Sequence, residues 1–161
     1  MLYHGSKTAG IEVVKPFPHN GVDGESVVFA TSDSRFALAM IHGTGNQLAV
    51  GYFTDRESRK EEMYIDELVP GAFMLLEEPG ILYTLEDTGF VSDPRLGHRE
   101  LISKCETPVI SESPHSNILT ELKKHDIRFV SYENVPIEME KRGRDPKKAV
   151  ISYKPDRFPQ S

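Results

Sequence analysis

The chain has 161 residues, 38% of them hydrophobic and 27% charged, and its formal net charge is −6. This balance predicts one soluble globular domain and argues against a general binder of nucleic acid. No apolar run reaches the length of a membrane span and no secretory leader is visible, so we expect a cytoplasmic protein without a membrane partner. The single cysteine, Cys105, excludes an internal disulfide.

The first predicted strand covers residues 2–6 and ends in His4-Gly5-Ser6. In an extended segment His4 and Ser6 point to the same face. Gly5 has no Cβ, so a ligand or another backbone can approach closely. The motif suits a hydroxyl-rich ligand such as a ribose, although an ordinary first strand that turns at Gly5-Ser6 has the same pattern.

A second unit follows, in which an extended run over 11–15 and a loop over 16–26 lead to a strand over 27–31. We interpret His19, in this loop, as a surface histidine. Ser32, Asp33 and Ser34 are N-cap candidates for a helix. The inward face of this helix is expected to carry Phe36, Ala37, Met40 and Ile41; Gly43 or Gly45 is expected to end it.

The remaining pattern predicts more strands than helices. Strands are expected over 47–53, 81–85, 99–104, 107–111 and 127–132. Parts of 64–78 have helical spacing, which Pro70-Gly71 is expected to split, and a later helix is expected to be capped by Ser116 or Asn117. Because strands and helices do not alternate regularly, we expect an α+β fold with mainly antiparallel pairing. Residues 1–135 are expected to form the domain. The basic segment 136–161 would then pack on it or fray, with an edge strand over 149–153 and its charge facing either solvent or an acidic partner.

Three separated segments carry a resemblance to a known family: Tyr3-His4-Gly5-Ser6, then Val28-Phe29-Ala30-Thr31 with its following helix, then residues 98–104 with Glu100. In this order they resemble the ADP-ribosyltransferase superfamily, which includes bacterial toxins, poly-ADP-ribose polymerases and rifamycin-modifying enzymes. The resemblance covers about the first two thirds of the chain. It implies a bacterial or phage transferase of the glycosyltransferase type, with a split pair of antiparallel sheets, a few flanking helices and NAD bound between the sheets.

The resemblance also implies roles for individual residues. His4 would hold the adenosine ribose, Gly5 would meet the nicotinamide amide through its backbone, and Ser6 would bond nearby. Glu100 would hold the 2′-hydroxyl of the nicotinamide ribose, so His4 and Glu100 are the expected catalytic residues. An ionised carboxylate at this place also suits the reaction itself, because breaking the glycosidic C–N bond builds positive charge on the sugar. No metal is expected. Further NAD contacts are expected from Thr31, Phe36 and Arg99.

Several alternatives stay open at this stage. Many family members have an aromatic residue where this chain has Val28, and Phe29 is expected on the opposite face. Phe36, Tyr52 or Tyr83 could stack on nicotinamide instead, or the chain could be a nucleotide-binding module that has lost catalysis. RNA 2′-phosphotransferase-like or antibiotic-modifying activity is a further possibility, and the acceptor of ADP-ribose is not specified. Arg95 and Arg99 could clamp a pyrophosphate or lie in a solvated loop, and Glu100 could form a surface pair with Arg99.

Overall fold

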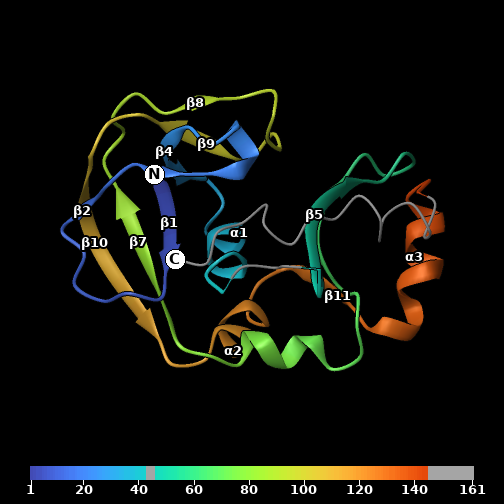
Figure 1. Ribbon diagram of the computed structural model, residues 1–161. Coiled ribbons are helices and arrows are strands. Elements are labelled where there is room, and N and C mark those ends of the chain that lie inside the picture. Colours follow the sequence, from blue (N-terminus) through green and yellow to red (C-terminus); the bar gives the residue numbers. More distant parts are fainter. Residues whose placement is uncertain (43–45, 145–161) are drawn as a thin grey trace.

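The computed structural model describes residues 1–42 and 46–144, and the strands of these residues form three sheets (Figure 1). The first has the order β1-β7-β10-β2, with bounds Leu2–Ser6, Gly80–Leu85, Thr107–His115 and Val13–Val14. The second has the order β3-β4-β9-β8, with bounds Phe17–Pro18, Ser26–Ala30, Leu101–Ser103 and Val91–Ser92. The third has the order β11-β6-β5, with bounds Ile127–Val130, Glu61–Glu67 and Leu48–Thr54.

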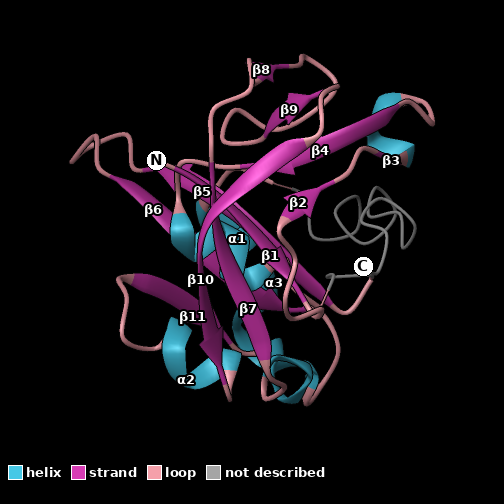
Figure 2. Ribbon diagram, turned by 90° about the vertical axis from the view of Figure 1, so that its left-hand side faces the viewer, coloured by secondary structure: helices cyan, strands magenta, loops and turns pink. Residues whose placement is uncertain are grey.

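Pairing within these sheets is antiparallel except between β11 and β6. The α+β class with mainly antiparallel sheets is therefore confirmed. β1, β7 and β10 run side by side as the body of the first sheet (Figure 2). None of the helices in the described residues is long and apolar enough to cross a membrane.

The expectation of helical structure over 64–78 is wrong for its first part, whereas the split expected at Pro70-Gly71 is confirmed. The first part of this segment belongs to β6, the central strand of the third sheet, in which Met63, Tyr64 and Ile65 are all buried. A strand covered on both faces has a continuous apolar run, which does not show the alternation of a half-exposed strand. Its second part forms the 3-10 helix η2 (Ala72–Leu76), which begins after Gly71 at φ +79°.

Two helices, α1 and α2, begin where their expected caps lie. Asp33 accepts a hydrogen bond from Arg35 N and caps α1 (Ser34–Ala39), and Asn117 accepts from Thr120 N and caps α2 (Ile118–Leu122). α1 lies between the first sheet and the third (Figure 1) and contributes Leu38 and Ala39 to the largest core cluster. The helix is shorter than expected, because it ends at Ala39 with Met40 as its C-cap, and Met40 and Ile41 follow it. Gly43 and Gly45, the residues expected to end it, lie outside the described residues.

The C-terminal part contains a helix that the sequence pattern did not predict. η3 (Tyr132–Asn134) leads directly into α3 (Val135–Lys141), so the boundary expected after residue 135 falls in the first turn of a helix. Val135 and Met139 pack with Val130 of β11, and α3 thereby adjoins the third sheet. The edge strand expected over 149–153 lies outside the described residues.

The first two sheets are joined at one isolated bridge among the described residues. Tyr3 of β1 and Thr31, immediately after β4, exchange two backbone hydrogen bonds, of 2.8 and 3.0 Å. Residues 13–18 also cross between the sheets, since β2 pairs with β10 and β3 pairs with β4. Beyond these links no strand of one sheet pairs with a strand of the other among the described residues, although Val28 and Ala30 of β4 pack with Ile81, Tyr83 and Leu85 of β7.

Candidate functional site

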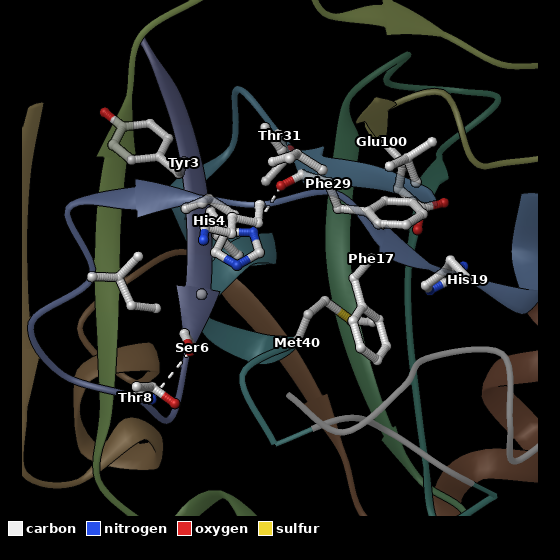
Figure 3. Close-up of a pocket in the computed structure, with 18 of the residues that line it drawn as sticks. Tyr3, His4, Ser6, Thr8, Phe17, His19, Phe29, Thr31, Met40 and Glu100 are labelled. Atoms are coloured by element: carbon white, nitrogen blue, oxygen red, sulfur yellow. Dashed lines mark hydrogen bonds between the residues drawn. The ribbon is translucent and has the colours of Figure 1, made fainter. Parts of the chain in front are cut away.

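A cavity of about 560 Å³ lies where the first two sheets separate (Figure 3). It brings together most of the site residues expected from the sequence, although they come from three distant segments. Those that line it are His4, Gly5, Ser6, Thr31, Phe36 and Glu100. Arg99 is not among the described residues of its wall.

His4 lies at the centre of the cavity wall with its ring orientation fixed by the backbone. Its Nδ1 is 2.8 Å from the carbonyl oxygen of Phe29. A carbonyl can only accept, so Nδ1 carries the proton and Nε2 is the acceptor of the neutral ring. Burial lowers the pKa of His4 below 6.5, and this effect outweighs the opposing effect of the bond to Phe29. At neutral pH the ring therefore presents an acceptor suited to a ribose hydroxyl.

The lowered pKa of His4 predicts a pH dependence of stability. The unfolded chain binds a proton at His4 more readily than the folded chain, so the free energy of unfolding should fall as pH decreases through 6.5. In His4→Gln this slope between pH 7 and 5.5 should be smaller, and part of it should remain because burial also lowers the pKa of His42. Urea unfolding at several pH values measures the slope. An unchanged slope in His4→Gln would contradict this expectation.

Gly5 turns its backbone toward the gap between the sheets. In a strand, the backbone N–H and C=O groups of residues i and i+2 point to the same side. The backbone groups of Tyr3 bond to Thr31, on the side of β1 away from β7. The N–H and C=O of Gly5 therefore face the side on which β4 diverges. A carboxamide, which has one donor group and one acceptor, could pair with both.

Gly5 is also where α1 approaches β1 most closely. A Cβ at this position would overlap the carbonyl oxygen of Ala37 and lie 2.5 Å from Ile41 Cγ1. We expect Gly5→Ala to lower the free energy of unfolding by about 2–3 kcal/mol, because a backbone oxygen cannot move aside without shifting the helix. Gly10→Ala is a matched control. Gly10 has φ +74° and no atoms within 4 Å of the added Cβ, so it should lose only about 1 kcal/mol. Equal losses in a urea titration would contradict the steric explanation.

Two hydroxyl groups of the wall have local partners. Ser6 Oγ accepts from Thr8 N at 3.1 Å, and Thr31 Oγ1 accepts from Asp33 N at 3.1 Å. Both residues are buried. These bonds fix the orientation of the hydroxyls and support the turn after β1 and the start of α1.

Glu100 lies immediately before β9, whereas the sequence pattern placed it inside a strand. Its side chain is 8% exposed, and its Oε2 accepts from Gly97 N at 2.7 Å. Figure 3 shows the carboxylate beside the Phe29 ring, on the same cavity as His4. The bond from Gly97 fixes one carboxylate oxygen within its own loop.

The aromatic part of the wall differs from the sequence expectation. Phe29 lies on the opposite face of β4 from Val28, as predicted, but the cavity extends to that face and Phe29 lines it. Val28 is 1% exposed and packs in the core. Of the other candidates for stacking, Phe36 lines the cavity, Tyr52 stacks behind it at 5.8 Å, and Tyr83 is fully buried. Val28, Tyr3 and Phe17 also line the cavity, so Phe36 and Phe29 are two of the four tyrosine and phenylalanine residues among the described residues of its wall.

The expectation that His19 is a surface residue is wrong. It is 6% exposed, lines the cavity and packs on Phe29, with 4.1 Å between ring centroids. The predicted loop over 16–26 contains the two-residue strand β3 and the 3-10 helix η1 (Asn20–Val22), whose Gly21 N donates to His19 Nδ1. A strand of only two residues shows no periodic pattern, so the sequence gives no signal that His19 is buried.

The two arginines near Glu100 bond to carboxylates. Arg95 pairs with Asp93, Asp23 and Glu25. Arg99 pairs with Glu61 and lies over the Tyr52 ring, with 5.1 Å from Cζ to the centroid. The contact of Arg99 with a cofactor stays a prediction. Lys15 is the one lysine or arginine among the described residues of the wall.

Comparisons with protein-family models, with curated proteins and with solved structures gave no match. Function is therefore inferred from the geometry of this cavity. Its described wall comprises a neutral imidazole acceptor, an open strand edge at a glycine, four tyrosine and phenylalanine side chains and a carboxylate.

Proposed function

We propose that the protein transfers ADP-ribose from NAD to an acceptor and releases nicotinamide. The observation that carries this proposal is that His4-Gly5-Ser6 and Glu100, far apart in sequence, line one cavity. Its volume of about 560 Å³ is within the range of pockets that bind small molecules and cofactors.

In this reaction the bond between C1 of the nicotinamide ribose and the pyridinium nitrogen breaks. Its electron pair stays with nicotinamide, which leaves as a neutral molecule. The acceptor bonds to the same carbon and loses its proton to solvent. The Glu100 carboxylate would stabilise the positive charge that develops on the ribose between these events. Gly5 would hold the carboxamide, Phe36 or Phe29 would stack on the pyridinium ring, and His4 Nε2 would accept from a ribose hydroxyl.

The wall argues against the RNA-directed alternative. A site for a phosphorylated RNA needs several cations to neutralise phosphates. The described part of the wall offers Lys15 alone, while Glu100 adds a negative charge. A dinucleotide with a single diphosphate makes a smaller demand on positive charge.

The test is to incubate the purified protein with NAD and to quantify nicotinamide by chromatography, alone and with cell extract containing labelled NAD. We expect nicotinamide release, and transfer of label when an acceptor is present. Calorimetry with NAD separates the alternatives. Binding without product would indicate a nucleotide-binding module. The absence of both binding and product would overturn the proposal.

A further inference from the structure

The two residues immediately before Glu100 both contact one carboxylate on another sheet. Glu61, the first residue of β6, accepts from Arg99 Nη2 through Oε1, and its Oε2 lies 3.3 Å from His98 Nε2. Both side chains also contact Tyr52 of β5. The Arg99 guanidinium lies over the Tyr52 ring, and the His98 ring meets it edge-on with 5.4 Å between centroids. The third sheet therefore holds the segment that carries Glu100.

The second sheet holds this segment on one side of Glu100 only, where Leu101 pairs with Ala30 of β4 and Ser92 of β8. β8 has two residues and β9 has three, and Glu100 lies between them. Glu100 bonds to Gly97 twice, through Gly97 N to Oε2 and through Glu100 N to Gly97 O at 3.0 Å. These bonds fix the shape of the turn. They do not fix its distance from the cavity, because both partners move with the same loop.

The contacts to Glu61 do connect the loop to a rigid part of the molecule. β6 is paired on both sides, with Glu61 opposite Thr54 of β5. Tyr52 donates to Asp33 Oδ2 at 2.8 Å, and Asp33 caps α1, which carries Phe36 of the cavity wall. The hydrogen bond from Arg99 lowers the pKa of Glu61, so the carboxylate is ionised at neutral pH.

We infer that Glu61 is a positioning residue of the proposed active site, because its contacts with Arg99 and His98 fix where the Glu100 carboxylate lies. The inference rests on the proposed function. It gives Arg99 a role different from the cofactor contact expected from the sequence. A displacement of about 1 Å in a catalytic group can cost on the order of 10²-fold in rate, whereas a half-exposed ion pair contributes little to overall stability.

The kinetic test measures kcat and KM for NAD in Glu61→Gln, Arg99→Gln and the double variant. We expect each single change to lower kcat by about 10- to 100-fold with KM nearly unchanged, and the double variant to resemble the single ones, because both remove the same contact. Glu57→Gln, on an exposed carboxylate in the turn before β6, is the control and should have wild-type kinetics. An unchanged kcat, or a raised KM at constant kcat, would overturn the inference; the second result would indicate that Arg99 binds NAD.

A second measurement does not depend on turnover. Amide hydrogen exchange of residues 97–100 should be faster in Glu61→Gln than in the wild type and unchanged in Glu57→Gln. Absence of nicotinamide release by the wild-type protein would refute the proposed function and the catalytic consequence of the inference. Unchanged exchange in Glu61→Gln would refute the positioning of the loop whether or not the protein turns over NAD.

Discussion

Glu100→Gln is expected to lower kcat for nicotinamide release by about 10²- to 10³-fold, the effect of removing one group that stabilises transition-state charge. Glutamine has nearly the same shape and can still accept the hydrogen bond from Gly97 N, so the loop should keep its conformation. The affinity for NAD should change little, because the charge that Glu100 stabilises develops only as the glycosidic bond breaks.

Steady-state kinetics and calorimetry with NAD together measure this effect. Glu106→Gln is a matched control, because Glu106 is an exposed carboxylate between β9 and β10. It should leave both kcat and affinity unchanged. Wild-type turnover in Glu100→Gln would remove the assigned role, and a large loss of NAD affinity would indicate that Glu100 acts mainly in binding.

Arg142→Met is expected to cause the largest loss of stability, about 3–5 kcal/mol, because it leaves a buried carboxylate without its cation. Arg142 follows α3 and donates to both oxygens of Asp66 on β6, at 2.6 and 3.1 Å. The two side chains are 4% and 1% exposed, and the Arg142 guanidinium also lies 3.7 Å from the Tyr64 ring centroid. The pair attaches the end of α3 to the third sheet.

The loss in Arg142→Met should shrink as pH falls from 8 toward 5. Burial raises the pKa of Asp66 even beside Arg142, and without the arginine its folded pKa should rise further above the unfolded value. The folded variant then binds more protons than the unfolded one, so its stability relative to the wild type should increase as pH decreases. Urea unfolding measures the loss of free energy of unfolding. Lys141→Met, which changes an exposed neighbouring residue, is the control. A loss below about 1 kcal/mol in Arg142→Met would contradict the role given to the buried ion pair.

Elements with strong local signals could be predicted from the sequence. β1, β4 and β7 have apolar or β-branched runs between turn residues, and α1 has an Asp33 cap followed by an apolar face. These elements place His4-Gly5-Ser6 and Phe36 correctly on the cavity. Helix α3 could not be predicted because Pro136, the exposed apolar Ile137 and Glu138 separate its buried apolar positions, Val135 and Met139, and so conceal the repeat.

Long-range contacts could not be predicted in the same way. Glu61 lies in a segment whose local pattern indicates solvated charge, and Arg99 lies at the start of an expected strand, so neither pattern indicates that the two residues pair. Their pairing follows from the approach of the β5–β6 unit to the loop before β9. His19 reaches the cavity because a two-residue strand, too short to show periodicity, redirects the chain. The strand β6 was also misread for a long-range reason, since it pairs with the distant β11 and its Met63 and Ile65 pack against residues from α1 and α2.

The segment over residues 13–18 sets a limit on what the cavity can admit. One end of this strap is fixed to β10 through Val13 and Val14, and the other to β4 through Phe17 and Pro18, so only Lys15 and Pro16 span the interval. From Val14 to Phe17 the chain advances three residues, which extend about 11 Å at most. The first two sheets therefore cannot move farther apart on this side without breaking one of these pairings, and because Val13, Val14, Lys15 and Phe17 line the cavity, the strap bounds its width here.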